Sequence, residues 1–485
     1  MLARVTTHAL VGLEPRKVEV EAHLQGQAPA FTIVGLADRA CQEAKHRVRS
    51  GIASAELEWP QRRITVNLAP AGLRKEGSGF DLAIALAVAA ASHQVPPERL
   101  EGHAVVGELA LDGRIRPVGG VLVVAEGARR LGIERLLCPA ASAPEAALAG
   151  VEPVPVRHLA EAIAYLRGER DPPPVESVNG HREARHPDLA DVRGQERARR
   201  ALELAAAGGH NLLLAGPPGI GKTMLARRLP GILPQLAAEE ALEVTRIHSV
   251  AGVLPPGEGL LTTAPFRAPH HTASAAAVVG GGGHAPRPGE ASLAHRGVLF
   301  LDEFPEFQRP VLEALRQPLE DGMVSIARAG GQALFPAAFQ LVATMNLCPC
   351  GGRADPGAEC SCTSQQLARF RSKLSSALLD RIDLVVTVPR PRAKELAAGP
   401  SESSAAVRGR VETARERLRA KRPGATNEAK ELLDRAVERL PLSGRGRRKV
   451  ACVAATAAAL EGSEQVLPAH VAEALSYRPP REIGT

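Results

Sequence analysis

Aromatic side chains are scarce in this chain of 485 residues, where Phe, Tyr and Trp together make up 2%. Long apolar runs are also absent: the most apolar stretch, Leu82–Ala91, falls far short of the roughly 20 residues that a membrane-spanning helix needs. No charged segment followed by an apolar core opens the sequence, so nothing resembles a secretory signal. We therefore expect a cytoplasmic protein with no membrane partner and few rings on which nucleic-acid bases could stack.

Cysteine is rare as well, and it is unevenly distributed. Four of the seven cysteines lie in one stretch, MNLCPCGGRADPGAECSCTS (Met345–Ser364). In a reducing compartment, an odd and clustered set of thiols favours metal binding or free thiols over disulfides.

Length and composition divide the chain into parts. At roughly 150 residues per domain, two to four domains are expected. A proline-rich, charged stretch without apolar periodicity predicts a linker over residues 169–187. It separates an α/β domain (1–168) from a second α/β domain (188–395), which an Ala-, Leu- and Arg-rich helical domain (396–485) follows. The net charge of +7 favours an anionic partner, with nucleic acid as the first candidate.

The strongest motif is NLLLAGPPGIGKTMLARRL, in which an apolar strand leads into a glycine-rich loop and then a helix. This is a complete P-loop in its required strand–loop–helix context. Its backbone N–H groups would surround a phosphate chain, Lys222 would reach the β- and γ-phosphates, and Thr223 would ligate Mg²⁺. The residues expected to bind ATP are Gly216, Pro217, Pro218, Gly219, Ile220, Gly221, Lys222, Thr223 and Asp302.

Polar side chains also lie at the ends of three further apolar strands. In GVLFLDEFPEF, Asp302 would complete the Mg²⁺ site with Thr223, while Glu303 would orient or deprotonate the attacking water. Asn346 ends the strand FQLVATMN, where it could touch the γ-phosphate or its water. Arg381 lies on a polar turn just before a fourth strand.

These motifs, with FRAPHHTAS, GGGGHAPRPGEASLAHRGVLFLDEFPEF, ATMNLCPCG and LLDRIDL, resemble those of the magnesium-chelatase-like AAA+ ATPases of the YifB/ComM family across nearly the whole chain. The resemblance implies an α/β AAA+ core with inserted hairpins and a helical C-terminal lid, assembled as a homo-oligomer, generally a hexamer. It also implies roles for three residues. Asn346 would be the sensor-1 residue, Arg381 an arginine finger supplied by a neighbouring subunit, and Arg445 the sensor-2 arginine of the lid.

The N-terminal domain resembles the Lon-type protease domain through RRITVNLAPAGLRKEGSGFDLAIALAVAAA and GRIRPVGGVLVVAEGARRLGIERLLCP. A peptidase of this type needs a Ser nucleophile that a Lys activates. The corresponding positions fall near Gly79 and on Leu122, and Ser78 lies one position from the nucleophile slot. A non-proteolytic scaffold is therefore favoured over a peptidase.

The cysteine cluster directly follows the strand that ends in Asn346. Four thiolates can close a tetrahedral Zn²⁺ site, which would hold together a glycine-rich segment with few apolar residues. Because residues i and i+2 of an extended strand point to opposite faces, a turn at Pro349 and Gly351–Gly352 has to bring the thiols together. Zinc is favoured over free thiols. The expected ligands are Cys348, Cys350, Cys360 and Cys362.

Two other motifs each allow two interpretations. His270 and His271 could ligate a metal, although adjacent histidines in a polar loop more often form hydrogen bonds. The segment RGRRKV, which includes Arg445, is either a DNA-binding patch or the solvated face of the lid helix.

Three functions fit these motifs. The resemblance favours a ring motor that hydrolyses ATP to move along branched or single-stranded DNA: a helicase that drives branch migration of recombination intermediates during natural transformation. The motor subunit of a metal chelatase and an AAA+ protein remodeller are the alternatives. Chelatase motor subunits are expected to lack both a fused Lon-like domain and this cysteine loop. A protein remodeller is disfavoured because the ATPase motifs have no accompanying peptidase dyad, so the DNA motor is preferred.

Overall fold

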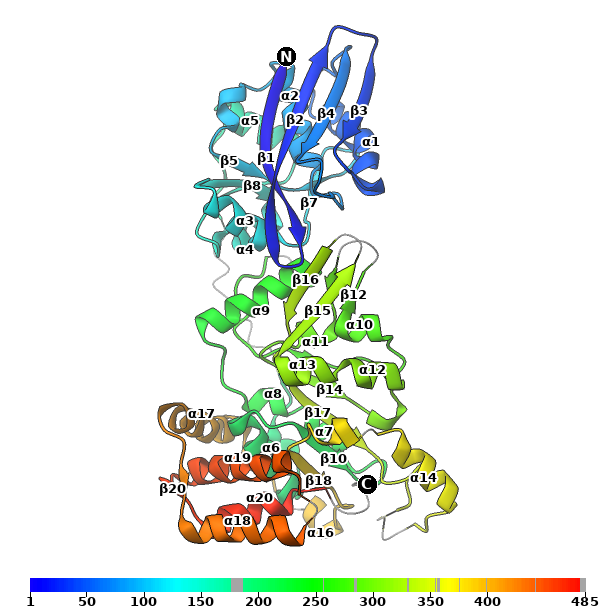
Figure 1. Cartoon of the computed structure of the whole chain (residues 1–485). Helices are drawn as coiled ribbons and strands as arrows, with labels where there is room; N and C mark the ends of the chain where they lie inside the picture. Colours follow the sequence, from blue (N-terminus) through cyan, green and yellow to red (C-terminus); the bar gives the residue numbers. More distant parts are fainter. Residues whose placement is uncertain are drawn as a thin grey trace.

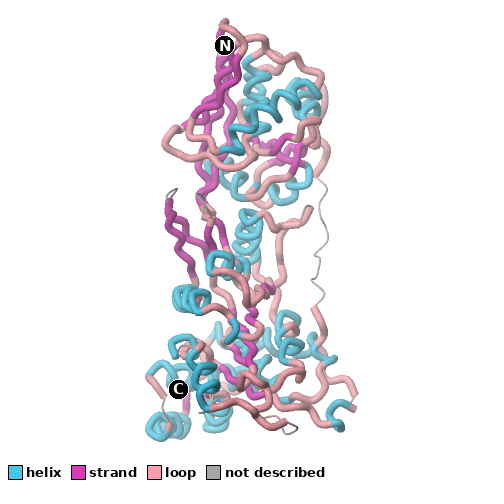
Figure 2. Tube along the Cα trace, turned by 90° about the vertical axis from the view of Figure 1, so that its right-hand side faces the viewer, coloured by secondary structure: helices cyan, strands magenta, loops and turns pink. Residues whose placement is uncertain are grey.

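The computed structural model describes residues 1–175, 186–255, 257–282, 286–328, 331–353, 355, 358–374, 376–397, 399–440 and 442–479. The N-terminal domain lies at one end of the molecule, the P-loop domain in the middle, and the helical domain beside the P-loop domain at the other end (Figures 1 and 2). None of the helices in these residues is long and apolar enough to cross a membrane.

The N-terminal domain is built on a seven-stranded sheet in the order β3-β4-β2-β1-β5-β8-β9. Its strands are β1 (Leu2–Val11), β2 (Glu14–Gln25), β3 (Ala30–Val34), β4 (Arg63–Ala69), β5 (His103–Val105), β8 (Arg135–Pro139) and β9 (Glu152–Val156), with a small pair of β6 (Glu108–Leu109) and β7 (Ile115–Arg116). Its helices are α1 (Arg39–Ser54), α2 (Asp81–Ala91), α3 (Val121–Arg130), α4 (Ala143–Ala147) and α5 (Leu159–Arg167). Helix α2 is buried throughout because ten of its eleven residues are apolar, and its one charged residue pairs with Arg47.

The P-loop domain contains a five-stranded parallel sheet in the order β11-β14-β17-β10-β18. The strands are β10 (Leu212–Ala215), β11 (Phe266–Arg267), β14 (Val298–Leu301), β17 (Gln340–Met345) and β18 (Leu384–Thr387). Two hairpins project from the domain, β12 (Gly280–Gly281) with β13 (Arg287–Pro288) and β15 (Met323–Arg328) with β16 (Gly331–Pro336) (Figure 1). The helices are α6 (Glu196–Gly208), α7 (Lys222–Ala226), α8 (Leu229–Ile232), α9 (Ala238–Ala251), α10 (Ala275–Val279), α11 (Glu290–Leu293), α12 (Arg309–Ala314), α13 (Arg316–Asp321), α14 (Ser364–Ser372), α15 (Ser376–Leu379) and α16 (Ala393–Leu396).

The C-terminal domain consists of α17 (Ser404–Ala420), α18 (Asn427–Arg439), α19 (Gly444–Glu461) and α20 (Pro468–Ser476). The region is helical, as the sequence predicted, and it also contains one short strand pair that the sequence did not predict. Two-residue strands β19 (Gly424–Ala425) and β20 (Gln465–Val466) form a parallel pair. This pair joins the segments that lead into α18 and α20, so it ties together the starts of two packed helices.

The N-terminal domain sits on helix α9 of the P-loop domain. Gly120 N–H donates to the Ser249 carbonyl at 2.8 Å, and Arg246 pairs with Glu126 at 3.1 Å. The β1–β2 turn also approaches the β15–β16 hairpin so closely that a Cβ on Gly12 would lie 2.7 Å from the Ala333 Cβ. The hairpin therefore lies at the junction of the two domains.

Candidate nucleotide site and metal centre

The P-loop and the predicted catalytic residues meet at the carboxyl edge of the parallel sheet. Ala215 lies opposite Met345 and Leu301 opposite Ala343, so the segments that follow β10, β14 and β17 leave the sheet side by side. All three strands are buried along their length. Ligands of open parallel sheets bind at this edge, as the sequence motifs predicted.

Glycine is required at particular positions of the P-loop. A Cβ on Gly216 would lie 2.4 Å from the Val388 carbonyl oxygen, which leaves no room for a side chain. Gly219 and Gly221 have φ angles of 76° and 91°, in the left-handed region that glycine adopts without strain. The loop thus turns sharply into helix α7, which begins at Lys222.

Lys222 is buried and directed back into the P-loop. Its Nζ donates to the carbonyls of Gly216 at 2.8 Å and Pro217 at 2.6 Å, and to Asn346 Oδ1 at 3.0 Å. Burial lowers the Lys222 pKa, an effect that the charges of Asp302 and Glu303 oppose. Three oxygen acceptors thus surround the ammonium group where phosphate oxygens would be stronger, charged acceptors. This arrangement brings Lys222 and Asn346 together, as expected for a P-loop lysine beside a sensor residue.

Thr223 and Asp302 are also brought together. The Thr223 hydroxyl donates to Asp302 Oδ2 at 3.0 Å, and the Thr344 hydroxyl donates to Asp302 Oδ1. A hydroxyl and a carboxylate in contact are the oxygen donors that Mg²⁺ prefers, so these residues fit the metal that accompanies ATP. Bound there, Mg²⁺ would neutralise charge on the phosphates.

Thr344 was missed in the sequence, although it is the only polar residue between Leu341 and Met345 in an apolar strand. Its hydroxyl also accepts the backbone N–H of Glu303 at 3.1 Å. Glu303 itself has a φ angle of 53°, an uncommon conformation for a residue other than glycine. Thr344 therefore holds the turn from which the Glu303 side chain projects.

Arg381 and Arg445 lie at the opposite edge of the sheet, away from Lys222. Arg381 precedes β18, and Arg445 is the second residue of α19. Both contact the same carboxylate: Arg445 lies 3.2 Å from Glu320 Oε1, and Arg381 pairs with the same oxygen. Arg381 also donates to the Ala377 carbonyl at 2.7 Å. Although its turn was expected to be polar, Arg381 is only 9% exposed, because it packs between this turn and α13.

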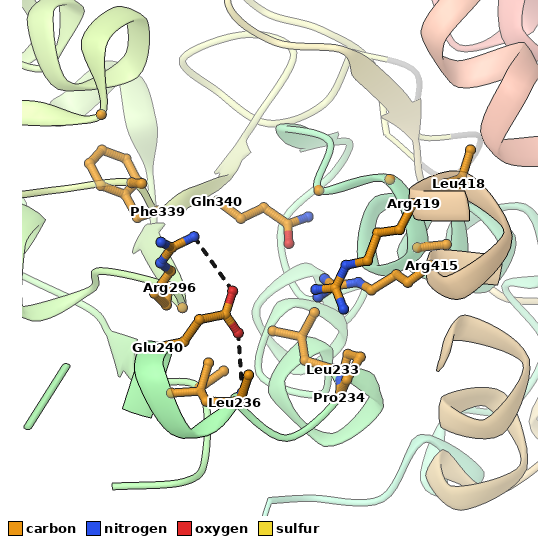
Figure 3. A pocket seen from close by; sticks show the side chains of 18 of the residues that line it. Leu233, Pro234, Leu236, Glu240, Arg296, Phe339, Gln340, Arg415, Leu418 and Arg419 are labelled. Atoms are coloured by element: carbon orange, nitrogen blue, oxygen red, sulfur yellow. Dashed lines mark hydrogen bonds and ion pairs between the residues drawn. The ribbon is translucent and has the colours of Figure 1, made fainter. Parts of the chain in front are cut away.

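Two adjoining cavities open at this opposite edge, where the parallel strands begin, which we call the amino edge. One of about 430 Å³ contains Arg381, Arg445 and Glu320. The other, of about 840 Å³, shares Glu320 with it and lies between the sheet and helix α17. Arg415 and Arg419 project into the larger cavity from α17, and Arg296 pairs with Glu240 at 3.5 Å on the facing wall (Figure 3).

The cysteine cluster forms a compact set of four sulfur atoms, all within 4.8 Å of one another. Cys348 Sγ lies 3.4 Å from Cys350 Sγ and 3.7 Å from Cys360 Sγ. Zn–S bonds of about 2.3 Å in a tetrahedron would place sulfur atoms roughly 3.8 Å apart, so the thiols fit a zinc ion. The thiols differ in pKa: a hydrogen bond from the Gly352 N–H lowers the pKa of Cys350 to about 5, whereas burial raises the pKa of Cys348.

The turn predicted at Pro349 and Gly351–Gly352 is present within this cluster. Gly351 has a φ angle of 79°, and a Cβ there would lie 2.8 Å from Cδ of Pro218 in the P-loop. The close approach brings the cysteine segment into direct contact with the nucleotide site.

Metal analysis of the purified protein is expected to find about one zinc per chain. Substituting both Cys348 and Cys360 by Ser should remove it, because two thiolates cannot complete the tetrahedron. Cys452→Ser, which changes a cysteine on α19 outside the cluster, should retain the metal. Zinc that persisted in the double variant would have to bind elsewhere.

The Lon-like positions of the N-terminal domain contain no Ser–Lys pair in the described structure. The Ser78 hydroxyl contacts Glu108 Oε2, and Lys75 Nζ donates to the Gly35 carbonyl at 3.1 Å. Leu122 is fully buried, and its N–H donates to Glu145 at 2.8 Å. Ser78 therefore faces a carboxylate and has no amine base among its hydrogen-bond partners.

Comparison with known protein families defines the class of this protein. Residues 188–396 match the model described as "Magnesium chelatase, subunit ChlI", residues 20–142 match "Subunit ChlI of Mg-chelatase", and residues 401–478 match "Magnesium chelatase, subunit ChlI C-terminal". The chain thus contains an AAA ATPase domain of the magnesium-chelatase type between an N-terminal ChlI-like domain and a helical C-terminal domain.

Individual relatives show to which family within this class the chain belongs. The chain is 42% identical to competence protein ComM of Haemophilus influenzae, over 98% of its own length and 97% of the relative's. It is also 42% identical to protein YifB of Escherichia coli, with the same coverage. It belongs to the YifB/ComM family of magnesium-chelatase-like proteins. Similarity to Lon protease 2 of Thermus thermophilus is partial, 35% identity over 104 residues, or 21% of this chain and 12% of the protease.

Proposed function

We propose that this protein is a ring-shaped, ATP-hydrolysing motor that acts on DNA and drives branch migration of recombination intermediates during natural transformation. The observation that supports it most is the division of the ATPase residues between opposite edges of one sheet. One edge carries the P-loop with Asp302 and Glu303, and the other carries Arg381 and Arg445.

Hydrolysis is assigned to the carboxyl edge. Lys222 binds the β- and γ-phosphates, and Thr223 with Asp302 would hold Mg²⁺. Glu303 orients the attacking water and accepts its proton. Asn346, which contacts Lys222, lies where it can sense the γ-phosphate.

The arginines are assigned to a neighbouring subunit's nucleotide. A four-residue strand such as β10 spans about 13 Å, so a side chain at its amino edge is separated from its own P-loop by the sheet. A homo-oligomeric ring, in our proposal a hexamer, would place the amino edge of one subunit against the carboxyl edge of the next. Arg381 and Arg445 would then act together, because Glu320 holds both at one place.

DNA is favoured as the substrate by the net charge of +7 and by the relationship to a competence protein. The hairpin β12–β13 projects from the core and offers a contact segment, with Arg287 exposed on β13 (Figure 1). The N-terminal domain would serve as a non-proteolytic, Lon-like scaffold, since Ser78 has a carboxylate partner.

A chelatase motor subunit is the second candidate, because all three matching family models carry a magnesium-chelatase description. One of them covers residues 20–142, so the presence of an N-terminal domain no longer argues against this alternative. The coverage of nearly all of ComM and the cysteine cluster still favour the DNA motor.

Purified protein on a synthetic four-way DNA junction tests the proposal. We expect binding without ATP and strand exchange only with hydrolysable ATP. Affinity should fall steeply with salt, by roughly 0.9 log units per log unit of salt for each phosphate contacted, and depend little on sequence. A protein that hydrolyses ATP but neither binds nor remodels branched or single-stranded DNA would favour a chelatase subunit or a protein remodeller instead.

A further inference from the structure

His271 lies beside Glu303 at the carboxyl edge of the sheet. Strands β11 and β14 pair in parallel, with Arg267 opposite Leu299. His271 and Glu303 each lie four residues beyond these partners, so the register brings them out of the sheet together. His271 Nδ1 lies 3.7 Å from Glu303 Oε2.

The His271 ring is held by aromatic neighbours. The His270 ring lies 4.2 Å from it between centroids, and the Phe307 ring meets it edge-on at 6.5 Å with an interplanar angle of 80°. His270 is fixed in turn, with its Nδ1 2.8 Å from the Thr272 hydroxyl. Among the described residues the two histidines belong to no group of metal ligands, so the metal interpretation of this pair has no support here.

Glu303 needs such a neighbour because only its backbone is fixed. Thr344 anchors its N–H, but the side chain is 60% exposed. Holding a catalytic group in one orientation raises the rate, since the ordering is done before the reaction. At 3.7 Å the contact with His271 is longer than a direct hydrogen bond, so it is a close polar contact between a ring nitrogen and a carboxylate oxygen.

We propose that His271 is a positioning residue for ATP hydrolysis: it holds Oε2 of Glu303 and leaves Oε1 to face the attacking water. The inference rests on the proposed ATPase function of Glu303 and adds a residue from the segment that follows β11. His271 does not touch the nucleotide in this role, so it should affect turnover and not ATP binding.

Steady-state ATPase kinetics of His271 variants test this role. In His271→Ala, kcat should fall roughly tenfold, a part of the 10²- to 10⁴-fold that a general base contributes, with KM for ATP unchanged. His271→Gln retains an N–H donor and should recover most of kcat. His271→Phe keeps the ring contacts without a donor and should behave like the Ala variant. His46→Ala, which changes an exposed histidine on α1, is the matched control and should leave kcat unchanged.

Combining His271→Ala with Glu303→Gln separates the proposed role of His271 from the proposed role of Glu303 as the residue that orients the water. If His271 acts through Glu303, adding His271→Ala to that variant should not lower the residual turnover further. Wild-type kcat in both His271→Ala and His271→Phe, with Glu303→Gln inactive, would overturn the role of His271 alone. A raised KM with unchanged kcat would also overturn it. An active Glu303→Gln variant would instead overturn the assignment of Glu303 as the water-orienting residue.

Discussion

Glu303→Gln is expected to bind ATP with wild-type affinity and to hydrolyse it at least 10²-fold more slowly, since a general base contributes on the order of 10²- to 10⁴-fold. The amide has nearly the shape of the carboxylate but cannot accept the proton of the attacking water. The backbone turn should be unaffected, because Thr344 contacts the Glu303 N–H and not its side chain. Nucleotide binding, measured by fluorescent-analogue titration, and phosphate release in a single turnover check the two parts of this expectation.

Lys222→Ala is the contrasting variant and should lose both binding and hydrolysis. Its ammonium contacts two P-loop carbonyls and Asn346, so its removal takes away the charge that meets the phosphates and also loosens the loop. Wild-type hydrolysis in Glu303→Gln would show that another group orients the water. Weak ATP binding in that variant would mean that Glu303 belongs to the binding site.

The carboxyl edge could be predicted from the sequence because its signals are local. The predicted catalytic residues Glu303 and Asn346 closely follow short apolar runs, and parallel strands place their carboxyl ends together whatever their order. For this reason Lys222 contacts Asn346, and Thr223 contacts Asp302. The cysteine cluster was also recognisable, since Gly351 supplies the turn that brings two C-x-C pairs together.

Contacts that depend on side-chain packing could not be predicted. Thr344 looked like one more residue of a buried strand, and its two hydrogen bonds emerge only when β14 and β17 are paired. Glu320 belongs to no recognised motif, yet it pairs with both Arg381 and Arg445, and Arg445 lies 125 residues further along the chain. The contact between His271 and Glu303 depends on the register of an edge strand of two residues, too short to be recognised from its pattern.

Arg381→Ala is expected to reduce ATP turnover by on the order of 10³-fold or more, as arginine fingers do, with ATP affinity nearly intact. The reason is geometric: Arg381 lies across the sheet from its own P-loop, so its guanidinium can stabilise charge on the γ-phosphate of a neighbour but not of its own subunit. Hydrolysis should therefore require assembly, and activity per chain should rise with protein concentration as rings form. Arg381→Lys is the matched control, because it keeps the positive charge at this site and removes only the guanidinium group.

Mixing two inactive variants tests whether the finger acts between subunits. A ring that contains both Lys222→Ala and Arg381→Ala chains has some interfaces at which an intact P-loop faces an intact finger, so ATPase activity and movement of DNA branches should return on mixing. Pure rings of either variant have no such interface. If mixed rings form, as differently tagged subunits that co-purify would establish, and activity stays absent, the finger does not act in trans. The shared contact with Glu320 predicts the same recovery when Arg445→Ala replaces Arg381→Ala, because both arginines lie at the edge that would face the neighbour.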